Sequence, residues 1–100
     1  MIDLTAFQKR VYQNKVDKGF NITDIYKEFC YIQGELTEVF EAYKDKKDDL
    51  GEELADVTLY ILGLSEILGI DLESELLKKM DKNEKRKYIH EDGVNIRVSE

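Results

Sequence analysis

The sequence of 100 residues contains no proline or tryptophan, and only one cysteine, one histidine and six glycines. Because proline breaks a helix and glycine weakens it, such a chain favours long, uninterrupted helices. Cys30 has no second cysteine to pair with, which excludes internal disulfides and favours a reducing, cytoplasmic setting. No apolar run has the length that a bilayer requires, and the first ten residues lack the apolar core of a signal peptide. We therefore expect a protein with no membrane partner.

The charge and length of the chain further narrow the possible classes of protein and partner. The formal net charge of −7 argues against binding to nucleic-acid polymers, because such binding depends on many lysine and arginine contacts to phosphate. A hydrophobic content of 42% is too high for a disordered chain. We expect one domain over residues 1–100, with residues 88–100 as a C-terminal tail. A chain this short has a thin core, which predicts a homodimer or a dimer of dimers.

Apolar residues recur at spacings of three and four through most of the chain, which predicts four helices. The expected ranges are about 4–18, 21–43, 49–68 and 71–87. Gly19 and Gly69 are expected to supply the left-handed residue that ends a helix. The expected N-caps are Asn21 or Thr23 for the second helix, Asp49 with Glu52 as a variant capping box for the third, and Asp71 for the fourth.

Two of these helices carry long apolar stripes that we expect to be buried. The stripe of the second helix is Ile25, Phe29, Ile32, Leu36, Val39 and Tyr43, and that of the third is Leu50, Leu54, Val57, Ile61, Leu64 and Leu68. The fourth helix is expected to place Leu72, Leu76 and Met80 inward. After it, YIHEDGVNIRV alternates apolar and polar residues around Asp92 and Gly93, which indicates a short hairpin or an ordered arm. The predicted fold class is all-α, a four-helix bundle completed by oligomerisation.

Two pairs of carboxylates lack the basic neighbours that such residues usually have. Glu35 and Glu38 are three residues apart on the second helix, and Glu53 and Asp56 are three apart on the third. A glutamate on a solvated helix usually has a lysine or arginine three or four positions away, and none of these four does. Residues 35–56 hold nine acidic side chains against three lysines, which lie together at positions 44, 46 and 47. If the helices are antiparallel, the pairs face a common space, where partly buried carboxylates must take up protons or bind a cation.

Oxygen ligands favour a hard cation, and a few carboxylates that leave room for water and phosphate suit Mg²⁺, with Mn²⁺ as a substitute. Zinc is disfavoured because His90 and Cys30 lie far from the cluster in the sequence. A ferritin-like di-iron site is disfavoured because neither acidic pair is followed by a histidine. The alternative interpretation is an ordinary charged interface, in which the carboxylates pair with lysine or arginine from another helix or subunit.

The fourth helix carries a basic stripe formed by Lys79, Asn83 and Arg86, which are spaced four and three residues apart. Residues 78–88 contain six lysines and arginines and two acidic residues, the inverse of the balance around the acidic pairs. A cation held by carboxylates together with such donors would suit a polyphosphate, whose oxygens need neutralisation. The alternative interpretation is a solvated helix end that complements the helix dipole.

Three segments together, GELTEVFEAY, EELADVTLYILGLSEILGIDL and KMDKNEKRKY, resemble the MazG-like all-α nucleoside triphosphate pyrophosphohydrolases. This superfamily also includes dimeric dUTPases and phosphoribosyl-ATP pyrophosphohydrolases, and the resemblance covers roughly residues 20–90. The family's pattern is E-x-x-E, a spacer, E-x-x-D, and then Lys, Asn and Arg on the next helix. In this sequence the pattern falls on Glu35, Glu38, Glu53, Asp56, Lys79, Asn83 and Arg86.

The resemblance implies Mg²⁺-dependent hydrolysis of a nucleoside triphosphate between the α and β phosphates, which releases a nucleoside monophosphate and pyrophosphate. The implied metal ligands are Glu35, Glu38, Glu53 and Asp56, and the implied phosphate-binding residues are Lys79, Asn83 and Arg86. Glu38 is the preferred catalytic base, a role that the sequence does not separate from metal binding.

The sequence departs from the family's pattern in two places. Tyr31 and Ile32 stand where many relatives carry additional acidic residues, so a reduced second-metal site is expected, with Glu28 as the nearest upstream carboxylate. Lys87 stands where many small relatives have proline, so the path into the tail is expected to differ, and His90 is expected to be a surface residue. Two other hypotheses are a non-catalytic module of the same fold that binds nucleotide or protein, and a purely structural helical dimer.

Overall fold

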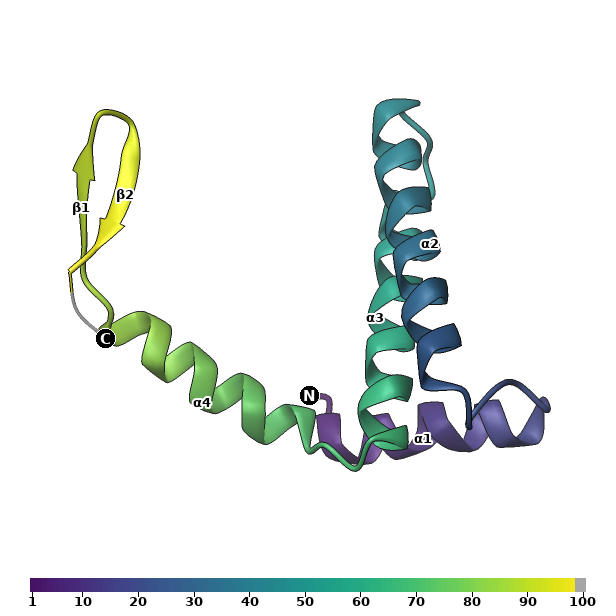
Figure 1. Ribbon diagram of the computed structural model, residues 1–100. Helices are drawn as coiled ribbons and strands as arrows, with labels where there is room; N and C mark the ends of the chain where they lie inside the picture. The colour runs from purple at the N-terminus through teal and green to yellow at the C-terminus, as the bar shows by residue number, and fades with distance from the viewer. Residues whose placement is uncertain (99–100) are drawn as a thin grey trace.

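A computed structural model describes residues 1–98 and contains four helices followed by a β-hairpin (Figure 1). The elements are α1 (Leu4–Asp17), α2 (Ile25–Lys44), α3 (Leu50–Ile67), α4 (Leu72–Lys85), β1 (Tyr88–Glu91) and β2 (Val94–Arg97). The predicted all-α class and the short C-terminal hairpin are therefore confirmed, and the last two residues of the predicted tail, 99 and 100, lie outside the described residues. No helix in the described part of the chain is both long enough and apolar enough to cross a membrane.

An aspartate is the N-cap residue of each of the four described helices, and in three of them its short carboxylate accepts from a free N–H group of the first turn. Asp3, Asp24 and Asp71 each accept a hydrogen bond from the backbone N–H three residues later. The prediction of Asn21 or Thr23 as the cap of α2 was wrong. Asn21 instead accepts a hydrogen bond from the backbone of Asp24 at 3.1 Å and so fixes the turn that precedes the helix. Asp49 is the N-cap residue of α3 as predicted, but the predicted capping box is absent, since the Asp49 side chain makes no capping hydrogen bond.

Glycines end α1 and α3 as predicted. Gly19 and Gly69 both have φ of +70°, a left-handed conformation that costs little only for glycine. In each case the following residue donates a backbone hydrogen bond back into the helix, Phe20 to Lys15 and Ile70 to Ser65, both at 2.9 Å. The predicted turn of the hairpin has positive φ at Asp92 and Gly93, and the strands pair Tyr88 with Arg97 and Glu91 with Val94.

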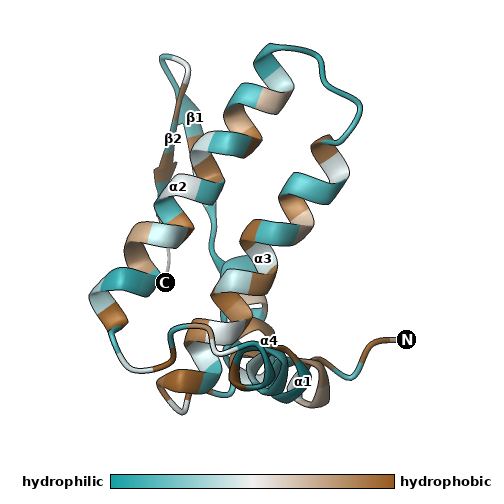
Figure 2. Cartoon of the chain, turned by 90° about the vertical axis from the view of Figure 1, so that its right-hand side faces the viewer, coloured by the Kyte–Doolittle hydropathy of each residue, from teal (hydrophilic) through white to brown (hydrophobic). Residues whose placement is uncertain are grey.

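Helices α2 and α3 form an antiparallel pair, and α1 crosses the end of that pair where α2 begins (Figures 1 and 2). The residues that face the partner helix recur every seven positions: Ile25, Ile32 and Val39 on α2, and Leu50, Val57 and Leu64 on α3. These are buried or partly buried. The prediction of continuously buried stripes was wrong for the other members, Phe29, Leu36, Tyr43, Leu54, Ile61 and Leu68. They are 41% to 71% exposed, because one partner helix covers only a narrow strip.

Helix α4 leaves the bundle instead of closing it (Figure 1). Its first turn is attached to α1, where the Glu73 carboxylate accepts from the backbone N–H of Leu4 at 2.9 Å and Leu72 is partly buried. The prediction that Leu76 and Met80 point inward was wrong for this single chain, in which they are 51% and 57% exposed. No residue of α4 is buried. Beyond the first turn, its apolar residues Leu76, Leu77 and Met80 are exposed.

Candidate metal centre

Three of the four predicted metal ligands meet between α2 and α3. Glu35 and Glu38 project from neighbouring turns of α2, and Glu53 projects from the first turn of α3. One carboxylate oxygen from each lies within 4.8 Å of the others. The short connection between the two helices makes them antiparallel, which sets the last half of α2 beside the beginning of α3.

The cluster is electrostatically unfavourable without a cation. Desolvation raises the pKa of Glu35, and the neighbouring Glu38 raises it further through its charge and through a hydrogen bond between the two side chains. Desolvation also raises the pKa of Glu53, followed by the negative charges of Asp49 and Glu38. Within residues 1–98, these carboxylates form no ion pair with lysine or arginine. The predicted alternative of an ordinary charged interface therefore has no support within one chain.

One atom of the cluster has an unmet hydrogen-bonding requirement. Oε2 of Glu53 is buried and has no hydrogen-bond partner. A buried carboxylate oxygen without a partner is costly, and a cation would satisfy it. Since Mg²⁺ binds oxygen at about 2.0–2.1 Å, its ligand oxygens lie roughly 3–4 Å apart. The observed spacing of up to 4.8 Å differs from this by no more than a small rotation of the side chains. The donor set and its spacing thus fit a hard divalent cation.

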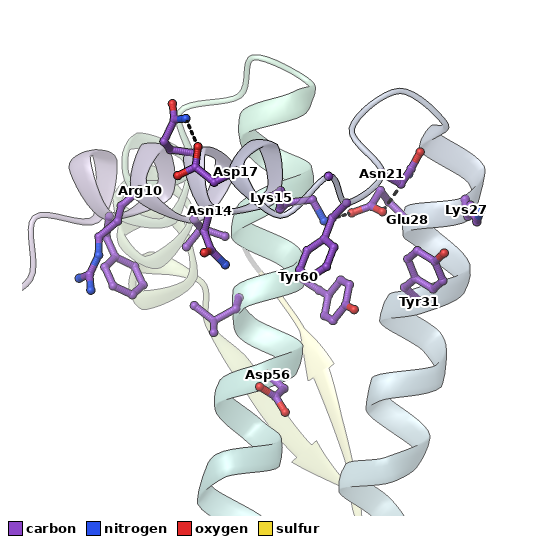
Figure 3. A pocket seen from close by; sticks show the side chains of 16 residues that line it. Arg10, Asn14, Lys15, Asp17, Asn21, Lys27, Glu28, Tyr31, Asp56 and Tyr60 are labelled. Atoms are coloured by element: carbon purple, nitrogen blue, oxygen red, sulfur yellow. Dashed lines mark hydrogen bonds and ion pairs between the residues drawn. The ribbon is translucent and has the colours of Figure 1, made fainter.

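Asp56 lies one turn further along α3 and is not one of the three converging carboxylates. Its negative charge is among the causes that raise the pKa of Glu35, which places it close to the cluster. It also lines a neighbouring pocket, where Figure 3 shows its side chain between α2 and α3. Asp56 therefore links the carboxylate cluster to that pocket.

The pocket lies between α1, the start of α2 and the middle of α3, and has a volume of about 870 Å³ (Figure 3). The rings of Phe7, Phe20, Tyr31 and Tyr60 contribute to its lining. The centroids of Tyr31 and Tyr60 are 6.0 Å apart with tilted planes. Burial is the main cause that raises the pKa of Tyr60, followed by the charge of Glu35. The pocket thus combines aromatic rings with one carboxylate, Asp56, that lies close to the cluster.

A buried ion pair at the wall of this pocket was not predicted from the sequence. Nζ of Lys15 lies 2.7 Å from Oε1 of Glu28, and the Asn21 amide donates to the other carboxylate oxygen at 2.9 Å. Both charged residues are buried, with 7% and 0% of their surface exposed. One feature of the sequence could have indicated that Lys15 is buried: it lies four residues after Val11, where the apolar stripe of α1 would continue. The pair fastens α1 to α2.

The predicted phosphate-binding residues do not meet the carboxylates within one chain. Lys79, Asn83 and Arg86 lie on or at the end of α4, which extends away from α2 and α3 (Figure 1). Nη1 of Arg86 donates to Oδ1 of Asn83 at 3.2 Å, and the Lys79 side chain forms no hydrogen bond or ion pair with any described residue. His90 lies on the exposed hairpin, where Nδ1 is 2.8 Å from Oδ1 of Asn95, so its predicted surface position is confirmed.

Fold and site together define a helical protein that carries a cluster of unpaired carboxylates on two antiparallel helices. The MazG-like family profile matches residues 27–100, a region that includes the cluster and the basic residues of α4. The chain belongs to the MazG-like family. The comparisons with curated proteins and with solved structures gave no match.

Proposed function

We propose that this protein is a Mg²⁺-dependent nucleoside triphosphate pyrophosphohydrolase. The observation that carries the proposal is the convergence of Glu35, Glu38 and Glu53 within 4.8 Å, without a basic partner among the described residues. The MazG-like family is associated with nucleotide pyrophosphatase activity, which supports a phosphoanhydride as the substrate. We also propose the cytoplasm as its compartment, because the single cysteine is free and nucleoside triphosphates are intracellular substrates.

Glu35, Glu38, Glu53 and Asp56 would hold the metal, with Mn²⁺ as a substitute. When bound, Mg²⁺ would supply Lewis acidity that neutralises negative charge on the phosphoryl oxygens. Tyr31 and Ile32 occupy the turn before the cluster, so this chain offers few further oxygen ligands there. Asp56, at the edge of the aromatic pocket, would orient the triphosphate relative to that pocket.

The reaction adds water across the anhydride between the α and β phosphates. The water oxygen bonds to one of the two phosphorus atoms that flank the bridging oxygen, and the bridging P–O bond breaks. We assign Glu38 as the base that takes the water's proton, because it is the exposed member of the cluster and therefore the one most accessible to a solvent water. Lys79, Asn83 and Arg86 would donate to the phosphate oxygens and stabilise the charge that develops on pyrophosphate. The products are a nucleoside monophosphate and pyrophosphate.

The test is pyrophosphate release from a panel of ribo- and deoxyribonucleoside triphosphates in the presence of Mg²⁺. We expect turnover that EDTA abolishes and that Mn²⁺ supports. Glu53→Gln should reduce kcat at least about a hundredfold, whereas Glu52→Gln, which removes the same charge from the adjacent exposed residue, should stay near the wild-type rate. Absence of turnover on every triphosphate would leave the non-catalytic binding module as the better interpretation.

A further inference from the structure

The pocket between α1, α2 and α3 keeps aromatic surface that is still exposed. Phe20, in the connection between α1 and α2, is 57% exposed, and Tyr31 on α2 is 39% exposed. Both residues line the pocket, whose volume of about 870 Å³ leaves room for a ligand of the size of a nucleoside. A nucleobase can cover such rings by stacking on them, whatever its identity. Selection among the bases therefore has to come from the polar groups of the lining.

The two helices of the pair carry matching stripes that lead from the carboxylate cluster to the pocket. In each stripe two carboxylates are followed, at spacings of three and four residues, by a tyrosine. The stripes are Glu38, Glu35 and Tyr31 on α2, and Glu53, Asp56 and Tyr60 on α3. The two tyrosine rings lie 6.0 Å apart, and both line the pocket. If the proposed function holds, a triphosphate bound at the carboxylates extends its nucleoside along these stripes toward the pocket.

Most polar groups of the lining already have partners. The Lys15 ammonium is paired with Glu28, and the Asn21 amide donates to the same carboxylate. On the outer part of α1, Gln13 donates to Asp17 at 2.8 Å. A group of this kind gains little from a ligand, because a new hydrogen bond would replace an existing one. These residues therefore contribute little to the selection of a base.

Two polar side chains of the lining on α1, Arg10 and Asn14, have no such partner. They are four residues apart and so lie on the same face of the helix. Within residues 1–98 neither side chain forms a hydrogen bond or an ion pair, and the Arg10 guanidinium lies 5.6 Å from the ring centroid of Phe7. Figure 3 shows both side chains projecting from α1 on the side where Asp56 and Tyr60 lie. They are the groups placed to bind the edge of a stacked base.

The two side chains differ in their ability to discriminate between bases. The Asn14 amide has both donors and an acceptor, and it can rotate to suit most bases. The Arg10 guanidinium has donors only, arranged in a fixed fork. A 6-oxopurine, such as guanine or hypoxanthine, presents the adjacent acceptors O6 and N7 to such a fork. Adenine and cytosine present an amino donor at the corresponding edge, which would oppose the donors of Arg10.

We propose that the pocket selects 6-oxopurine nucleoside triphosphates, with Arg10 donating to O6 and N7 of the base and the Asn14 amide oxygen accepting from N1–H. Uracil and thymine have a single acceptor, O4, at this edge and rank second. Adenine and cytosine rank last. This inference rests on the proposed function, for which it specifies the class of substrate.

The first experiment compares kcat/KM for the guanine, hypoxanthine and adenine triphosphates. The wild type should favour the two 6-oxopurines over adenine at least about tenfold. Arg10→Gln should abolish or reverse this preference, because a glutamine amide can pair with both N6 and N7 of adenine. The control is Lys9→Gln, which makes the same change of charge at the adjacent exposed residue outside the pocket and should keep the wild-type preference. Equal values for guanine and adenine in the wild type, or an unchanged preference in Arg10→Gln, would overturn the proposal.

Asn14→Ala has a different expected signature. Because a rotatable amide serves every base, this variant should lose kcat/KM several-fold for all three substrates and keep their order. Both Arg10 and Asn14 are exposed, so circular dichroism should show unchanged helix content in each variant. Loss of the guanine preference in Asn14→Ala, with the preference intact in Arg10→Gln, would overturn the assigned roles.

A binding measurement separates this inference from the proposed function. Isothermal titration with guanosine, inosine and adenosine monophosphates requires no turnover, and the first two should bind more tightly to the wild type but not to Arg10→Gln. Selective binding without turnover of any triphosphate would refute the proposed function and retain the selection of the base. Turnover at equal rates for all bases would retain the proposed function and overturn the selection. Absence of both binding and turnover would overturn both.

Discussion

Glu35 is the residue whose ionisation is most clearly opposed by its surroundings. Its pKa is raised above 4.5 by desolvation and by the charges of Glu38, Asp56 and Glu53. A carboxyl group whose pKa is raised in the folded state binds protons more tightly there than in the unfolded chain. It therefore favours folding at low pH, and that contribution is lost as the pH rises from about 4.5 through the folded-state pKa. At neutral pH its charge destabilises the metal-free protein.

Replacement of Glu35 by glutamine should therefore raise the melting temperature of the metal-free protein. We expect an increase of a few degrees at pH 7 in EDTA, which becomes smaller near pH 4, where Glu35 is mostly protonated in both states. Added Mg²⁺ should stabilise the wild type more than the variant, because the variant lacks one ligand. Thermal melts of both proteins, followed by circular dichroism at pH 7 and pH 4 and with EDTA or Mg²⁺, measure these differences. A variant less stable than the wild type at pH 7 without metal would contradict the electrostatic account.

At the scale of the elements, the attachment of α1 to the α2–α3 pair depends on the buried pair of Lys15 and Glu28. The Lys15 stem packs against Gly63 of α3, where an added Cβ would lie 3.1 Å from its Cδ, and its ammonium lies 5.2 Å from the Tyr60 ring centroid. One side chain thus contacts both helices of the pair. Removing either charge leaves the other buried and unpaired.

Glu28→Ala should lower the free energy of unfolding by about 3–5 kcal/mol, as measured by urea denaturation. Lys15→Met/Glu28→Leu replaces both charges with apolar groups of similar size and should recover most of that loss. The exposed pair of Lys85 and Asp81, 2.9 Å apart on α4, provides the control. Asp81→Ala should change stability by less than about 1 kcal/mol. Equal losses from Glu28→Ala and Asp81→Ala would show that burial of the first pair has no energetic effect.

The helices and the hairpin could be predicted because their signals are local. The spacing of apolar residues determines a helix, and glycine determines where α1 and α3 end. The N-cap of α2 was misplaced because Asn21, Thr23 and Asp24 are all good caps within four residues. The choice among them depends on Asn21, whose amide is committed to Glu28 and to the backbone carbonyl of Asp24. Glu28 is in turn paired with Lys15 of α1, a tertiary contact that the periodicity of apolar residues does not reveal.

At the scale of the whole molecule, the convergence of Glu35, Glu38 and Glu53 was predictable because a five-residue loop forces α2 and α3 to be antiparallel. The direction of α4 could not be predicted from the sequence. Leu76 and Met80 carry the periodicity of a buried stripe, and periodicity shows that a face needs a partner without showing which chain supplies it. The prediction placed Leu76 and Met80 inward in a four-helix bundle that oligomerisation completes, whereas α4 extends away from α2 and α3 of its own chain (Figure 1).

A chain with so much uncovered apolar surface should be much less stable alone than in a dimer, so folding and association should be coupled. The unfolding equilibrium of a coupled dimer depends on protein concentration, because unfolding releases two chains. We expect the melting temperature to rise by several degrees for each tenfold increase in concentration. In Leu36→Lys, whose added charge opposes burial of the exposed apolar residues of α2 and α3, the melting temperature should be lower and independent of concentration. Calorimetry over a hundredfold concentration range separates these outcomes, and a wild-type melting temperature that stays constant over that range would show that the single chain folds without a partner.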